Sequence, residues 1–411
     1  MAGIPALAQQ PPLTWEQVRA SFEANNPALK ADADNVDEMR AEEITAYLRP
    51  NPQIGVTADG TQIVPNNGVW QPLAGTFVVP SISYLHERDH KRELRLKSAR
   101  EGTQISESLH GDLKRNLEFA LRSAFVQTLE AKAVLKVAQD DIAYYDHIIA
   151  ISQDRYKAGD IAQIDLDRIE LLRVQYEAEL QTAIVNLRTA KIQLLQLLND
   201  QTPVAQFDVT GPFDFSANLD PLDSFRQVAL ANRPDLQAAL QTIQQSETNH
   251  KLAIANGSTD PTFGAWYTWN SSTNNTNTDH LQTLGLNVSI PLRIFDRNQG
   301  EKQRTQIDID RAREASEATR AQVFSDVDTA YAEVASNIAL LKPYKDQYNA
   351  QALRVRDTVT YAYEHGGASL MDFLNAQSDY RLVQLAYEQL IGDYLTAAAQ
   401  LNLAVGREVI Q

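Results

Sequence analysis

The chain has 411 residues, of which 43% are hydrophobic and 22% are charged, so it can bury a core and does not have the composition of a disordered chain. Its formal net charge of −16 argues against nucleic acid as a partner, because binding nucleic acid requires a basic surface. The absence of cysteine excludes disulfides, thiol catalysis and zinc sites with cysteine ligands.

Residues 1–12 are predicted to be the remnant of a signal peptide or an N-terminal tail. Ala6-Leu7-Ala8 has the A-x-A form of a secretory cleavage site, but the basic region and most of the apolar segment that precede such a site are missing. A plain tail is the alternative interpretation.

The rest of the chain contains one unit twice. Six residues recur with the same identity 207 positions later in the chain. The pairs are Asn25 and Asn232, Pro27 and Pro234, Leu29 and Leu236, Tyr156 and Tyr363, Gly159 and Gly366, and Asp165 and Asp372. We therefore predict a first repeat over 13–199, a linker over 200–222 that is rich in proline, and a second repeat over 223–411.

Each repeat predicts a helix, two short strands and a long helical hairpin, which makes the fold mainly α with four β-strands. The first repeat has a helix at 14–47, strands at 52–64 and 76–85, and a hairpin at 87–199. The second has a helix at 223–255, strands at 261–270 and 282–291, and a hairpin at 298–405. In the second helix of each hairpin, the intervals between apolar residues alternate between three and four positions. This is the spacing of a coiled coil.

Two glycine turns reverse the chain in these hairpins, Gly159-Asp160 and Gly366-Gly367, because glycine readily adopts the left-handed conformation that ends a helix. Pro343 should kink or locally open the second long helix. Each long helix of about 65–70 residues would extend roughly 100 Å, about the combined length of the two shorter helices of its repeat. This match predicts a cylindrical wall of uniform length.

The second strand pair has the clearest pattern. Apolar residues alternate with mostly polar or small ones, and the candidates for a membrane-facing side are Phe263, Tyr267, Trp269, Leu284, Leu286 and Val288. The first pair is weaker because Pro80 lies within it. No apolar run approaches the roughly 18 residues of a membrane-spanning helix, so a membrane crossing would need strands. A soluble four-stranded sheet packed on a helix is the alternative.

Four strands cannot close a barrel within one chain, because known barrels begin at about eight strands. Open sheet edges cannot face lipid either. If these strands span a membrane, several chains must therefore share one barrel.

The chain resembles the TolC-like outer-membrane factors of tripartite efflux and type I secretion systems. The resemblance rests on Arg155-Tyr156-Lys157-Ala158-Gly159, on Tyr363-Glu364-His365-Gly366 and on Val288-Ser289-Ile290-Pro291-Leu292. It implies a homotrimer in the bacterial outer membrane that extends into the periplasm. Three chains would build a trimeric α-barrel tunnel, topped by a shared 12-stranded β-barrel in contact with outer-membrane lipid.

The same resemblance implies partners and a gate. A periplasmic adaptor protein would dock at Gly159, Asp160, Gly366 and Gly367, and an inner-membrane pump would deliver the substrates. Asp372 matches the acidic constriction, Asn375 replaces a second acid of the family, and Ala368 lies where the family often has a basic residue. Tyr363 and Asp165 match members of the family's bond network at the periplasmic tip, and Arg155 is a further candidate residue of the gate.

Elementary electrostatics gives two interpretations of Asp372. Three such carboxylates close to a symmetry axis would repel one another, raise the pKa of the set and favour cations. The alternative is a carboxylate that only stabilises the positive end of its helix, and the same alternative holds for Asp165.

The function predicted from these features is a passive exit duct, and the alternative is a soluble periplasmic coiled-coil scaffold or adaptor. We expect no enzyme, cofactor or metal site: there is no glycine-rich phosphate loop or catalytic triad, and His86 and His90 have no apparent third ligand. The exported substrate is not readable from the sequence.

Overall fold

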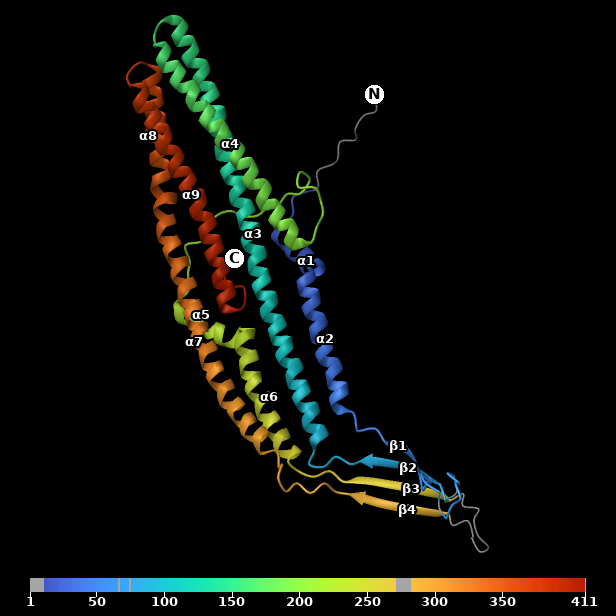
Figure 1. Cartoon of the computed structure of the whole chain (residues 1–411). Helices are drawn as coiled ribbons and strands as arrows, with labels where there is room; N and C mark the ends of the chain where they lie inside the picture. The colour runs from blue at the N-terminus through green and yellow to red at the C-terminus, as the bar shows by residue number, and fades with distance from the viewer. Residues whose placement is uncertain (1–10, 66, 74, 271–281, 411) are drawn as a thin grey trace. The chain divides into compact units, whose positions relative to one another are not determined.

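The computed structural model describes residues 11–65, 67–73, 75–270 and 282–410, so the interpretation of residues 1–10 as a signal-peptide remnant lies outside the described residues. The described chain is mainly helical with four antiparallel strands, as predicted (Figure 1). It divides into two compact units: unit 1 comprises Met1–Asp34, Ser108–Gln237 and Ala318–Gln411, and unit 2 comprises Asn35–Glu107 and Ala238–Glu317. Each unit takes segments from both repeats, so the compact units do not follow the repeats.

The elements of the two halves repeat with the sequence. The first half contains α1 Trp15–Asn25, α2 Pro27–Tyr47, β1 Gln53–Asp59, β2 Phe77–Leu85, α3 Lys91–Ala158 and α4 Gln163–Leu198. The second contains α5 Leu222–Asn232, α6 Pro234–Asn256, β3 Thr262–Asn270, β4 Thr283–Ser289, α7 Gln299–Pro343, the π-helix η1 Tyr344–Tyr348, α8 Asn349–Glu364 and α9 Leu370–Val405. Both ends of α1 and α5, and both ends of α4 and α9, are 207 positions apart.

The prediction of uninterrupted helices at 14–47 and 223–255 was wrong. The chain is extended at Asn26 (φ −64°, ψ 120°) and at Arg233 (φ −71°, ψ 119°), which separates α1 from α2 and α5 from α6. Pro27 and Pro234 cause both breaks, because a proline has no N–H to donate and disfavours a helical conformation in the residue before it.

The two residues at these breaks have equivalent roles with different chemistry. The Asn26 side chain donates to the carbonyl oxygen of Leu197 at 3.0 Å, and Arg233 donates to that of Ala404 at 3.3 Å. Leu197 and Ala404 are themselves 207 positions apart. Arg233 also pairs with the Asp326 carboxylate at 2.7 Å, so each break is tied to the end of a returning helix within unit 1.

Other element ends follow the same local rules. The predicted strand 52–64 ends at Asp59, because Gly60 turns the chain with a φ of 80°. The predicted strand 282–291 ends at Ser289, two residues before Pro291. After Pro343 the helix opens into the π-helix η1, which agrees with the predicted local opening.

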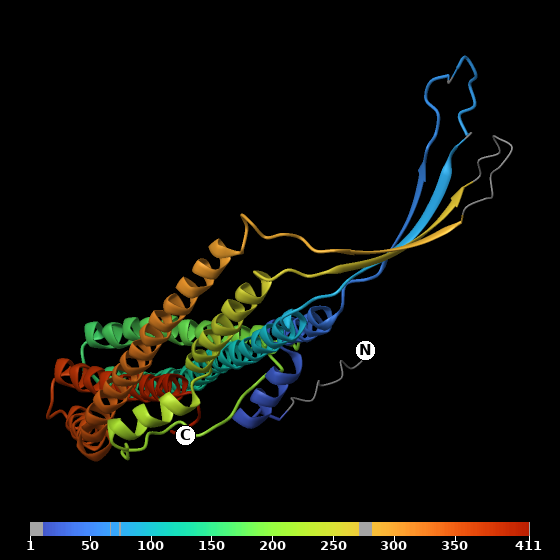
Figure 2. The same cartoon turned by 90° about the horizontal axis from the view of Figure 1, so that it is seen from below.

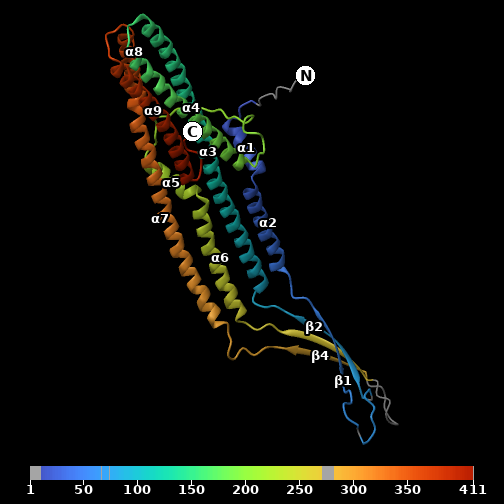
Figure 3. The same cartoon turned by 45° about the horizontal axis from the view of Figure 1, so that its top comes forward.

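Unit 1 contains both hairpins: α3 with α4, and α8 with α9 (Figure 3). Its core includes apolar residues of the linker, since Phe207 and Val209 are buried against α1, α3 and α4. The backbone of Leu13 donates to that of Asp208 at 2.9 Å, so the linker is held at the start of the first repeat.

Unit 2 contains the sheet, with its strands in the order β1-β2-β3-β4 and every neighbouring pair antiparallel (Figure 2). No helix among the described residues offers a stretch that is both long and apolar enough to cross a membrane.

Candidate functional site

The six predicted membrane-facing residues lie on one face of the sheet. Phe263 is opposite Val288, and Tyr267 is opposite Leu284, in the register of β3 with β4. Directly opposed residues of paired strands project to the same side of a sheet, and alternate residues of one strand share a face. Leu284 is 76% exposed within the described chain, so this apolar face is open.

The first strand pair continues this face, although its sequence pattern was weaker. Ile54 is opposite Ile82, Ile82 is opposite Ala265, and Ala265 is opposite Leu286, so one apolar row crosses all four strands. Ile54 is 81% exposed. Pro80 lies on the same face opposite Val56, and the ladder continues on both sides of it.

The other face of the sheet carries mostly small and polar residues. Gly264 is opposite Asn287, and a Cβ atom built on Gly264 would lie 2.2 Å from the Asn287 side-chain oxygen. Trp266 is the aromatic exception on this face, and its ring covers Gly285: a Cβ on that glycine would lie 2.2 Å from the ring. The glycine therefore leaves the space that the indole occupies.

This sheet is amphipathic, and within the part of the chain that the structure describes its apolar face is largely exposed. Burial of apolar surface stabilises a protein by roughly 25 cal/mol per Å² removed from water, so an apolar row across four strands requires an apolar environment. Among the described residues, β1 and β4 each have one edge that no further strand pairs. An exposed apolar face and open strand edges are the features that other chains would have to cover, and such an assembly stays a prediction.

The hairpin turns have the glycine geometry that was expected. Gly159 has a φ of 84° and Gly366 a φ of 75°, and both are exposed. The N–H of Asp160 donates to the Arg155 carbonyl at 2.9 Å, and the N–H of Gly367 donates to the equivalent carbonyl of Ala362 at 2.7 Å. The helices α3 and α8 therefore end with the same backbone hydrogen bond, from an N–H to the carbonyl oxygen five residues earlier. Both turns are exposed and thus accessible to a partner.

Behind the turns, the structure brings Arg155 of the first hairpin to Tyr363 of the second. The Arg155 guanidinium lies 5.0 Å from the centre of the Tyr363 ring and donates to the Tyr363 carbonyl oxygen at 3.0 Å. Phe373 stacks on the Tyr363 ring, with the ring centres 4.8 Å apart. The buried Tyr363 hydroxyl has no hydrogen-bond partner among the described residues, so Asp165 does not bond to it.

Asp372 forms a capping box at the start of α9. The Ser369 hydroxyl donates to the Asp372 carboxylate at 2.7 Å, and the Asp372 N–H donates to the Ser369 hydroxyl oxygen at 3.1 Å. The bonds from the Ser369 hydroxyl and backbone lower the pKa of Asp372. Within one chain Asp372 therefore acts as a helix cap, and Asn375 is exposed one turn further along. A ring of Asp372 carboxylates needs other chains and stays a prediction.

Arg381 connects the two hairpins, and the sequence did not single it out. From α9 it donates to the Asp141 carboxylate of α3 at 3.0 Å and to the Glu179 carboxylate of α4, and it lies over the Tyr176 ring at 5.1 Å. Burial raises the pKa of Asp141 to about 6 in spite of the attraction of Arg381. We call Arg381, Asp141 and Glu179 the inter-hairpin clamp.

A second polar contact lies nearer the turns. Gln377 of α9 donates to the Tyr144 hydroxyl of α3 at 2.5 Å, and that hydroxyl lies 3.0 Å from the Thr360 hydroxyl of α8. Within one chain the two hairpins are thus joined by polar contacts as well as by the aromatic cluster.

Comparison with known proteins agrees with this architecture. Residues 225–407 match the family described as outer membrane efflux protein, as the resemblance in the sequence predicted. The chain is 22% identical to the cobalt-zinc-cadmium resistance protein CzcC of Cupriavidus metallidurans over 410 residues, which cover 96% of this chain and 90% of that protein.

Solved structures share the fold. The CusC channel superposes with a TM-score of 0.80 at 16% identity, covering 98% of this chain and 96% of that one. The open state of the MtrE outer membrane channel of Neisseria gonorrhoeae gives a TM-score of 0.76 at 16% identity, covering 96% and 89%.

Proposed function

We infer that this chain, whose residues 225–407 belong to the outer membrane efflux protein family, is the outer-membrane channel of an efflux or type I secretion system. It would be a passive exit duct for substrates that an inner-membrane transporter delivers through a periplasmic adaptor. The observation that carries this proposal is the exposed apolar face that crosses all four strands, with a mostly polar face behind it. A sheet between lipid and an aqueous lumen needs these two faces.

The assembly that we propose is a homotrimer. No further described strand pairs with the outer edges of β1 and β4, which supports a trimer because a sheet that faces lipid must close on itself. Three chains with four strands each would close a twelve-stranded barrel. The helical hairpins would form the periplasmic tunnel, with the turns at Gly159 and Gly366 available to the adaptor.

The gate would lie beside these turns. Asp372 is exposed and projects from the first turn of α9, so it is accessible to its copies near a symmetry axis. The name of the relative CzcC makes divalent cobalt, zinc and cadmium the first cargo to test, and the net charge of −16 is compatible with the passage of cations.

A matched pair of substitutions tests the membrane assignment. Leu286→Arg puts a charge on the apolar face, where arginine costs about 2–4 kcal/mol at the middle of a bilayer, and should remove the protein from the outer-membrane fraction. The control Asn287→Arg places the same charge on the opposite face, next along the strand, and should leave membrane insertion intact.

The soluble scaffold is the alternative, and the same experiment separates the two. Wild-type protein that is recovered from cells in buffer without detergent, with equal recovery of both variants, would refute the channel and support the scaffold. The apolar face argues against that outcome, because in water it would remain exposed.

A further inference from the structure

We propose that unit 1 contains a binding site for a small carboxylate with an apolar body, in the cleft that α1, α3 and the end of α9 form beside Arg122. The inference goes beyond the proposed channel, because it concerns a ligand of the channel wall and not the cargo. Its basis is a guanidinium group that lies against aromatic rings and has no anionic partner among the described residues.

The cleft has a volume of about 340 Å³, which is within the range of sites that bind small molecules. Trp15 and Arg19 of α1 line it, and so does Pro234 at the start of α6. Phe119 of α3 and Leu403 of α9 add apolar surface to its walls. All of its lining residues belong to unit 1, so the contacts within one chain form the cleft.

The segment that follows α9 lines one side of the cleft. Gly406 ends α9 with a φ of 83° and turns the chain, so that Arg407 and Glu408 come to line the cleft. The side chain of Asn402 holds this turn, because its oxygen accepts from the N–H of Val409 at 2.7 Å. This wall is therefore formed without a ligand.

Arg122 is the residue on which the proposal depends. Its guanidinium carbon lies 4.5 Å from the centre of the Trp15 ring and 5.9 Å from that of the Phe125 ring. Among the described residues, no group forms a hydrogen bond or an ion pair with this guanidinium. Burial lowers the pKa of Arg122, and the attraction of Glu408 and Glu16 offsets this effect only in part. A partly buried cation without a partner is costly, so an anion in the cleft would stabilise it.

A second arginine of the cleft also has an unpaired donor. The side chain of Arg115 is 12% exposed, and it donates to the carbonyl oxygen of Leu403 at 2.6 Å and to the Asp112 carboxylate. Its buried Nε has no hydrogen-bond partner among the described residues. Five basic and two acidic side chains line the cleft, although the chain as a whole has a net charge of −16. The cleft is therefore a basic site in an acidic protein.

The ion pairs around Arg122 favour a ligand with a single negative charge. Arg19 is already paired with Glu118 at 3.1 Å. Lys114 is already paired with Glu23 at 3.0 Å. The planar guanidinium of Arg122 matches a carboxylate, which it can bind through two parallel N–H···O bonds. A doubly charged phosphate would be repelled more strongly by the acidic side chains of the cleft.

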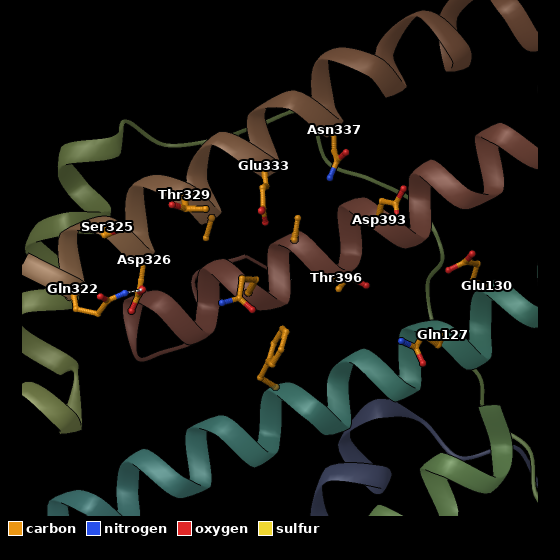
Figure 4. Close-up of a pocket in the computed structure, with 14 residues that line it drawn as sticks. Gln127, Glu130, Gln322, Ser325, Asp326, Thr329, Glu333, Asn337, Asp393 and Thr396 are labelled. Atoms are coloured by element: carbon orange, nitrogen blue, oxygen red, sulfur yellow. Dashed lines mark hydrogen bonds between the residues drawn. The ribbon is translucent and has the colours of Figure 1, made fainter. Parts of the chain in front are cut away.

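The second repeat shows that the equivalent helix folds without these basic residues. At the offset of 207, Arg122 corresponds to Thr329 of α7. Likewise, Arg115 corresponds to Gln322. Both of these residues of α7 line a separate, larger cleft between α7 and α9 (Figure 4). Its described lining residues include four acidic side chains and no basic one, so the basic groups beside Arg122 do not serve a packing role common to both repeats.

Calorimetric titration of the full-length protein in detergent tests the site with three probes of similar size. Phenylacetate should bind saturably, with one site per chain. Phenylacetamide lacks the charge and should bind at least about tenfold more weakly, because it cannot form charge-assisted bonds. Phenyl phosphate should also bind more weakly than phenylacetate.

Each contrary result overturns a stated part of the proposal. Absence of saturable phenylacetate binding at millimolar concentration would overturn the site. Equal affinity for phenylacetate and phenylacetamide would overturn the role of the cation. Tighter binding of phenyl phosphate would overturn the assignment to carboxylates.

A matched pair of variants tests the role of Arg122. Arg122→Met keeps a long side chain beside Trp15 and removes the cation, so it should weaken phenylacetate binding at least about tenfold. Arg354→Met removes an exposed cation of α8 that does not line the cleft, and it should bind phenylacetate as the wild type does. Unchanged binding by Arg122→Met would overturn the proposal.

Two further variants keep the proposal testable if Arg122→Met fails to fold. Glu408 is exposed and attracts Arg122, so Glu408→Gln removes a competitor of the ligand and should tighten phenylacetate binding about two- to fivefold. Unchanged or weaker binding would contradict that competition. Phenylacetate should also change the tryptophan fluorescence, and Trp15→Phe should remove this change, because Trp15 lines the cleft. A change that persists in Trp15→Phe would place the ligand elsewhere and overturn the site.

Discussion

Replacing Asp141 by asparagine should change how the stability of this protein depends on pH. Burial in the inter-hairpin clamp raises the pKa of Asp141 from 3.8 to about 6. A shift of about 2 units corresponds to about 3 kcal/mol. Because the pKa is higher in the folded than in the unfolded chain, the protonated carboxyl favours the folded state. This stabilisation is complete below about pH 4 and is lost as the pH rises through about 6.

The asparagine side chain cannot titrate, so the variant lacks this dependence. The free energy of unfolding of the wild type minus that of Asp141→Asn should fall by about 3 kcal/mol between pH 4 and pH 8. Denaturant unfolding followed by circular dichroism in detergent, at one-unit steps of pH, measures this difference. Comparing two pH values cancels the hydrogen bond to Arg381 that the substitution also alters.

Asp140→Asn is the control for the loss of one carboxylate, since its side chain is 61% exposed and pairs with Lys136 on the same helix. A constant difference between wild type and Asp141→Asn across this range would refute the argument. It would mean that water reaches Asp141, so that burial in the clamp does not penalise the charge.

Three further predictions concern single contacts, each measured as a change in the free energy of unfolding. Arg381→Met removes the cation that favours the ionised clamp carboxyl, so the pH transition should move to higher pH, whereas Arg381→Lys should restore it in part. Arg233→Ala removes a buried cation that pairs with the partly exposed carboxylates of Asp235 and Asp326, and it should cost more than the about 1–2 kcal/mol of Asn26→Ala; equal costs would contradict the charge argument. Ser369→Ala should cost about 1 kcal/mol, and Ala162→Ser, at the equivalent position, should stabilise α4.

The local features of the fold could be predicted because their causes are local. The strand pair at β3 and β4 follows from alternation of period two, and the hairpin turns follow from Gly159 and Gly366, whose left-handed conformation disfavours other residues. The helix breaks are local too, because Pro27 and Pro234 each disfavour a helical conformation in the residue before them.

The structure shows where the predicted site residues lie, whereas their roles stay predictions. Arg155 donates to the Tyr363 carbonyl oxygen, and the six strand residues share one face of the sheet, as their alternation requires. The capping box shows a local role for Asp372 that the sequence had already offered as an alternative. Whether Asp372 also narrows a pore depends on other chains.

The sequence by itself determined the repeat, the element types, the amphipathic strands and the turns, because each depends on residues within one element or on a constant offset. Only the tertiary structure decided that Arg381 reaches Asp141 and Glu179, which lie 240 and 202 positions away, and that Trp266 covers Gly285. Such contacts depend on how helices and strands pack side by side, and no periodicity records which long side chain fills which space.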